Sequence, residues 1–142
     1  MDRYEKKKVV YTAQSKHLFY AKMLICKFVL EKDYIPLNPF NNWAYFLDDM
    51  VDRNIVARAN NNLIMISDEL WQFGPIADGC LEEIRFAVKQ NKNIRFFSAG
   101  KKSSDIKELN IDELVFEEEV LLTENKEKLL EEIKKYYGER ML

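Results

Sequence analysis

Three carboxylates gather around a glycine in the middle of the chain: Asp78 precedes Gly79, and Glu82 and Glu83 follow it at the start of an amphipathic helix. Consecutive helical side chains point about 100° apart, so Glu82 and Glu83 do not face the same pocket. Glu83 lies nearer the inward, apolar face to which Ile84 belongs. A carboxylate at a pocket edge is able to attack a sugar carbon as a nucleophile, with a second carboxylate as acid–base partner. Alternatively, these carboxylates only stabilise the first turn of the helix, and Asp78 is its N-cap.

The elements around these carboxylates form a strand-to-helix junction. Residues 69–73 are predicted to be a short apolar strand, Gly74 lies in the turn that follows, and a helix runs from Gly79 to about Asn91. In a parallel α/β sheet, ligands bind at the carboxyl ends of the strands. We therefore expect the functional site at this junction.

Strands and helices alternate along the rest of the chain. Four further strands are predicted, at 9–13, 34–37, 93–97 and 114–116. One helix is predicted after an N-cap at Ser15 and another after a cap at Thr123. Between them, a long helix is predicted over 43–67 and a short helical turn over 104–109. Residues 63–66 are alternatively a strand. This alternation predicts an α/β protein, a single three-layer, Rossmann-like sandwich with a mostly parallel sheet of about five strands and helices on both faces. One domain is expected over 1–142, with 123–142 as a C-terminal helix.

Composition narrows the class of protein. The 142 residues carry a net charge of −2 and 47% of them are apolar, which fits a globular domain without general attraction to nucleic acid polymers or membranes. The sequence shows neither a secretory signal nor a membrane-spanning run, so a cytoplasmic protein is expected. Cys26 and Cys80 lack metal-ligand spacing and are expected to be reduced. No cofactor or metal is predicted, because phosphate-binding glycine motifs and metal-ligand clusters are missing. A Cys80 nucleophile paired with His17, the only histidine, has no local support.

The spacing Gly79-x-x-x-Glu83-Ile84-x-x-Ala87 after an apolar strand resembles the signature of the nucleoside 2-deoxyribosyltransferase superfamily. The first strand agrees, because Val10-Tyr11 and the small-residue loop after it resemble that family's opening strand and active-site tyrosine. The segment 35–40 resembles its second strand and proline. The resemblance covers about residues 7 to 98 and is closest to small uncharacterised members.

The resemblance implies a role for each matching residue. Glu83 would attack C1′ of a (deoxy)nucleoside or nucleoside 5′-monophosphate, Tyr11 would orient its carboxylate, and Asp78 would protonate the leaving base. Backbone N–H groups at Gly79 would approach the sugar or a phosphate. The further residues implied in substrate binding are Gly74, Phe40, Trp43 and Asn60. Phe40 and Trp43 would stack on the base. Trp71 is a weaker candidate for stacking, because core packing is the favoured role for this residue. The superfamily also implies a homodimer or larger homo-oligomer.

Two departures from the superfamily pattern weaken the acid–base half of this mechanism. Ala77 stands where the family usually places an acidic residue or a serine, and Asn60 stands where it tends to carry an aspartate. An asparagine holds a sugar hydroxyl but does not exchange a proton. The sequence therefore leaves two functions open: an N-glycosidic bond hydrolase or transferase, and a non-catalytic nucleotide-binding or regulatory module on the same fold.

Overall fold

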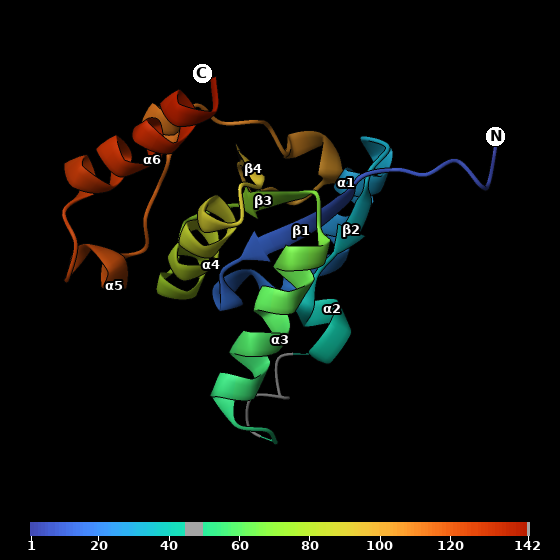
Figure 1. Ribbon diagram of the computed structural model, residues 1–142, viewed down its shortest axis with the longest axis horizontal. Helices are drawn as coiled ribbons and strands as arrows, with labels where there is room; N and C mark the ends of the chain where they lie inside the picture. Colours follow the sequence, from blue (N-terminus) through green and yellow to red (C-terminus); the bar gives the residue numbers. More distant parts are fainter. Residues whose placement is uncertain (45–49, 142) are drawn as a thin grey trace.

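The computed structural model describes residues 1–44 and 50–141 (Figure 1). Four parallel strands form one sheet in the order β2-β1-β3-β4, with β1 at Val9–Gln14, β2 at Ile35–Leu37, β3 at Glu69–Phe73 and β4 at Asn93–Phe97. From β1 the chain moves to one side to form β2 and then to the other side to form β3. The carboxyl ends of β1 and β3 therefore flank the topological switch point, where ligands bind in open α/β sheets.

Helices cover both faces of the sheet, which confirms the predicted three-layer α/β sandwich. On one face, Val10, Trp71 and Phe97 pack against α1 (Lys22–Glu31) and the 3-10 turn before it (Lys16–Ala21). On the other face, a second cluster joins the sheet to α3 (Arg53–Ile66), α4 (Asp78–Lys89) and α6 (Lys126–Met141). Its buried members include Tyr11, Leu70, Ile64, Ile84 and Ile133. Trp71 is fully buried, so it belongs to the core.

The predicted fifth strand at 114–116 is wrong. In the part of the chain that the structure describes, this segment forms a single parallel bridge, between Ile76 and Phe116. The pattern misled because Leu114 and Phe116 are buried and Val115 is exposed, as in a half-buried strand. The short 3-10 turns at Ser103–Asp105 and Ile111–Glu113 and the short helix α5 (Glu118–Leu121) keep the segment too irregular for a ladder.

The predicted helix over 43–67 also needs correction. The structure has α2 at Pro39–Trp43 and begins α3 only at Arg53, because the Asp52 carboxylate accepts a hydrogen bond from Asn54 N and caps the helix there. Residues 45–49 of the predicted helix lie outside the described residues. From Arg53 onward the helix is as predicted, and the strand alternative for 63–66 is excluded.

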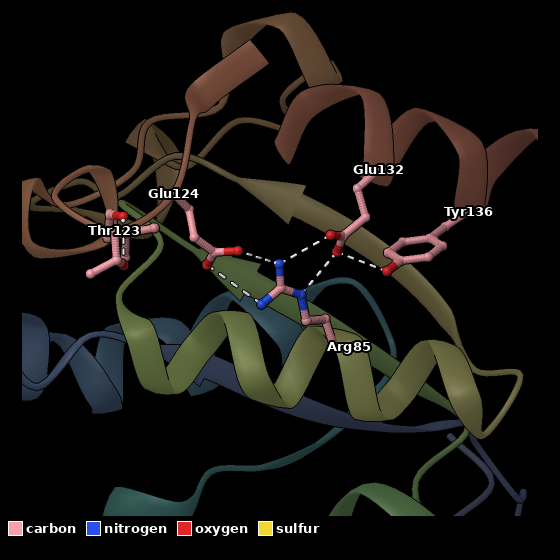
Figure 2. A network of polar contacts seen from close by, with 6 residues as sticks. Arg85, Thr123, Glu124, Glu132 and Tyr136 are labelled. Carbon is pink, nitrogen blue, oxygen red and sulfur yellow. Dashed lines mark hydrogen bonds and ion pairs between the residues drawn. The ribbon is translucent and has the colours of Figure 1, made fainter. Parts of the chain in front are cut away.

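The C-terminal part of the chain is attached to α4 by a polar network (Figure 2). Arg85 of α4 donates to Glu124 at 2.7 Å and to Glu132 of α6 at 2.9 Å, and the Tyr136 hydroxyl also donates to Glu132. The helix begins at Lys126 rather than directly after the expected cap at Thr123. Asn125 takes that role, since its side-chain oxygen accepts from Lys128 N.

Candidate active site

Glu83 lies in the second turn of α4, and its carboxylate accepts a hydrogen bond from the Tyr11 hydroxyl of β1. The two residues are 72 positions apart in the chain. They meet because α4 packs across β1 on the face to which Tyr11 points. Tyr11 is fully buried, whereas Glu83 is partly buried and Glu82 is exposed. The arrangement holds one carboxylate rigidly at the boundary between core and solvent.

Burial raises the pKa of Glu83 from its ordinary value of 4.5 to about 7. The Tyr11 hydrogen bond opposes this change, because it favours the charged carboxylate, and the nearby Glu82 charge adds to it. Burial and the Glu83 charge together raise the pKa of Tyr11 well above its ordinary value, so the phenol remains a hydrogen-bond donor. Glu83 thus changes charge near neutrality, which is typical of functional carboxylates.

Three adjoining clefts open around Glu83. The carboxylate cleft, about 380 Å³, is lined by Gln14, Ser15, Asp78, Gly79, Glu83 and Glu119, among others. The aromatic cleft, about 340 Å³, is lined by Lys16, Phe40, Trp43, Arg53, Ala57 and Asn60, among others. The helix cleft, about 450 Å³, includes Asn60, Gly79, Glu82, Glu83 and Phe86. Lys16 and Phe40 are shared by the first two clefts, and Glu83 lies where the first and third meet.

Asp78 and Gly79 occupy the first turn of α4 and line the carboxylate cleft with Glu83. Both are exposed, and the Asp78 side chain does not cap the helix, because α4 has Ala77 at its N-cap position. A Cβ on Gly79 would meet no heavy atom within 4 Å, so packing does not require a glycine here. The first N–H groups of a helix lack partners within the helix, which leaves them available to a ligand above Gly79.

Phe40, Trp43 and Asn60 come together in the aromatic cleft. The Trp43 indole N–H donates to the Asn60 side-chain oxygen at 2.7 Å and ties α2 to α3. Phe40 packs edge-on against Phe19, with ring centroids 5.3 Å apart. Gly74 is separate from this group. It has a φ of 73°, and a Cβ there would lie 2.5 Å from the Leu18 side chain. The positive φ in the turn after β3 therefore explains why a glycine occupies position 74.

Several residues that line the clefts were not predicted from the sequence. Gln14, Ser15 and Lys16 follow β1, and Glu119 comes from α5. Their local signal was weak, because polar residues after a strand are ordinary and Glu119 stands in an acidic run. A further missed residue is Asn38, buried after β2, whose amide donates to Thr12 Oγ1 at 2.8 Å and to Gln14 Oε1 at 2.7 Å. This network fixes the loop ends next to the clefts.

Cys80 lies beneath the same helix start but is poorly suited to nucleophilic chemistry. Its thiol is buried, and burial raises its pKa to about 12. His17 lies instead 3.9 Å from Glu117. Across the described residues, no three His, Cys, Asp or Glu side chains are grouped to hold a metal ion, and no helix is long and apolar enough to span a membrane.

The fold and this junction define an α/β protein with a parallel sheet and a candidate site at the carboxyl ends of β1 and β3. The chain is similar to the 2-deoxyribosyltransferase of Bacillus psychrosaccharolyticus, with a TM-score of 0.50 and 18% identity over 77% of this chain and 85% of that one. It is also similar to a CMP N-glycosidase of Clostridium botulinum, with a TM-score of 0.47 and 16% identity over 91% of this chain and 100% of that one. A search of curated proteins gave no match. Residues 10–97 match a family model, and the chain belongs to this family, the Domain of unknown function (DUF7768).

Proposed function

We propose that this chain cleaves the N-glycosidic bond of a (deoxy)nucleoside or nucleoside 5′-monophosphate, with the Glu83 carboxylate as nucleophile. The observation that carries this proposal is the Glu83–Tyr11 pair, a partly buried carboxylate held by a phenol at the meeting point of two clefts. A structural carboxylate at a helix start is normally solvated. Glu83 instead bears the desolvation that raises its pKa to about 7.

The proposed reaction has two steps. An ionised Glu83 oxygen bonds to C1′ while the bond from C1′ to the base nitrogen breaks, and the bonding pair leaves with the base. Asp78, which lines the same cleft, supplies the proton that the departing nitrogen takes up. Water or a second base then attacks C1′ and gives its proton to the Asp78 carboxylate, while the bond from C1′ to Glu83 breaks and the Glu83 carboxylate is restored. The Tyr11 hydroxyl orients the carboxylate oxygen throughout.

The aromatic cleft supports binding of the base. Phe40 lines both this cleft and the carboxylate cleft, so its ring lies on the route from Glu83 to Trp43. Aromatic side chains stack on the face of any nucleic acid base. Asn60 adds an amide group beside Phe40 and Trp43 in this cleft. The N–H groups at the start of α4, next to Gly79, are placed to approach sugar hydroxyls.

Two observations favour the non-catalytic alternative, a nucleotide-binding module. The Asn60 oxygen is already occupied by the Trp43 indole, and Ala77 adds no ionisable group to the carboxylate cleft. Such a module would use the same clefts without turnover. Binding in that case would raise the melting temperature of the protein while the nucleoside remained intact.

The test is base release from a panel of nucleosides and their 5′-monophosphates, followed by chromatography. Wild-type protein is compared with Glu83→Gln and with Glu131→Gln, an exposed carboxylate on α6 that lines none of the three clefts. Release that persists in Glu131→Gln and is lost in Glu83→Gln supports the proposal. Adding a second free base then separates a transferase, which forms a new nucleoside, from a hydrolase. Absence of release from wild-type protein, with ligand-induced thermal stabilisation, supports the binding module instead.

A further inference from the structure

Charge is divided unevenly around the candidate site. The cleft on the Glu83 side is lined by three carboxylates, Asp78, Glu83 and Glu119, and by one cation, Lys16, which it shares with the aromatic cleft. The aromatic cleft carries two cations, Lys16 and Arg53, and no carboxylate among its described lining residues. The carboxylates would stabilise an oxocarbenium-like transition state of an N-glycosidic substrate, because positive charge develops at C1′. The two cations suit a negative charge elsewhere on the same substrate.

The two cations are available for a ligand. Ion pairs between described residues engage other cations, namely Lys7, Lys8, His17, Arg85, Arg95 and Lys134. Asp52, which precedes Arg53 in the chain, accepts a hydrogen bond from Asn54 N as the cap of α3. Lys16 and Arg53 are both exposed at the surface of the cleft. Neither Lys16 nor Arg53 therefore forms an ion pair with a described residue.

The backbone places these cations at fixed points of the site. Lys16 follows Ser15, whose side chain caps the turn after β1 by accepting from His17 N. Arg53 is the first residue of α3. Lys16 lines both the carboxylate cleft and the aromatic cleft, so a ligand that reaches it also reaches the Glu83 side. One substrate is thus able to contact the carboxylates and the cations together.

We infer that Lys16 and Arg53 form a phosphate subsite, and that the substrate is a nucleoside 5′-monophosphate rather than a free nucleoside. This inference rests on the proposed function for the identity of the substrate as a nucleoside derivative. Guanidinium and ammonium groups bind phosphate oxygens by charge-assisted hydrogen bonds, the arginine in a bidentate fork. A phosphate on the carboxylate side would meet repulsion from Asp78, Glu83 and Glu119. The distribution of charge therefore also sets the direction in which the substrate lies.

The inference is tested by binding without turnover. Glu83→Gln protein is titrated calorimetrically with common ribonucleosides and with their 5′-monophosphates. The monophosphate is expected to bind more tightly, by about tenfold or more. Adding Lys16→Gln or Arg53→Gln weakens binding of the monophosphate about tenfold more than binding of the nucleoside, and higher salt reduces the preference. Arg58→Gln, an exposed arginine on the same helix but outside the clefts, leaves the preference intact.

Two results would overturn the phosphate subsite. One is equal affinity for nucleoside and monophosphate in the Glu83→Gln protein. The other is an equal loss for both ligands in Lys16→Gln and Arg53→Gln, which would place the cations against the base. If wild-type protein releases base from nucleosides and monophosphates with the same KM, the proposed function stands and the subsite fails. If the binding preference is present but wild-type protein releases no base, the subsite stands and the proposed catalysis fails.

Discussion

Glu83 is expected to make folding stability depend on pH, in a way that Glu83→Gln removes. The folded state raises the pKa of this carboxyl from 4.5 to about 7, so the folded protein retains a proton that the unfolded chain releases. The stabilisation linked to this proton is fully present below about pH 4.5 and is lost as the pH rises through about 7. Above that value, a buried charge remains in the wild-type protein.

The size of the effect follows from the two pKa values. At about 1.4 kcal/mol for each pKa unit, a rise from 4.5 to about 7 corresponds to about 3 kcal/mol of lost stability at high pH. Part of the loss has already occurred at about pH 5, so about 2.5 kcal/mol is expected between about pH 5 and pH 8.5. This is an upper limit, because solvent in the cleft screens the carboxylate. A glutamine is neutral at both pH values, and its oxygen still accepts the Tyr11 hydrogen bond.

The assay is urea unfolding at about pH 5 and about pH 8.5, for wild type, Glu83→Gln and Glu131→Gln. Glu131 is an exposed carboxylate on α6 and serves as the matched control. Glu83→Gln is expected to gain stability relative to wild type as the pH rises, by up to about 2.5 kcal/mol, whereas Glu131→Gln does not. Two results would show that the carboxylate is not desolvated as described. One is a difference in the free energy of unfolding between Glu83→Gln and wild type that does not vary with pH. The other is a Glu83→Gln protein that is less stable than wild type at the higher pH.

Further predictions concern activity and local structure. Base release is expected to rise with pH up to about 7, because only the ionised carboxylate attacks C1′; a rate that falls over this range would make Glu83 an acid instead. Tyr11→Phe removes the hydrogen bond that lowers the pKa of Glu83, so the midpoint of the pH–rate profile shifts upward and the rate at pH 7 drops about tenfold. Gly74→Ala is expected to cost about 1–2 kcal/mol by thermal or urea unfolding, because φ is 73° and the Cβ clashes, whereas Gly79→Ala, with open space around its Cβ, changes stability by less than about 0.5 kcal/mol. Arg85→Ala breaks a bidentate contact with Glu132, so amide exchange of α6 is expected to accelerate while that of β3 is unchanged; equal acceleration in both would contradict a local role.

The sequence by itself determined the strands and helices nearest the site. The apolar run 69–73, the turn at Gly74 and the amphipathic helix after it have the predicted bounds to within a residue or two, because local periodicity and glycine conformation set them. The same pattern distinguished inward Glu83 from exposed Glu82. The strand predicted at 114–116 was wrong because a strand requires a partner edge along several residues, and among the residues that the structure describes only Ile76 pairs with it.

The resemblance implied the contact between Tyr11 and Glu83, but only the tertiary structure decided what else surrounds this carboxylate. The Tyr11 hydroxyl meets Glu83 across 72 positions of sequence, and the Glu83 pKa of about 7 arises from burial that no local motif measures. Lys16, Arg53 and Glu119 stand in ordinary charged stretches, where a solvated side chain is the default expectation. They line the clefts around Glu83 because the strand order brings the ends of β1 and β3 together, and α2, α3 and α5 then surround that point. Sequence patterns specify local geometry, whereas the charge around a cleft depends on which distant segments the fold places beside it.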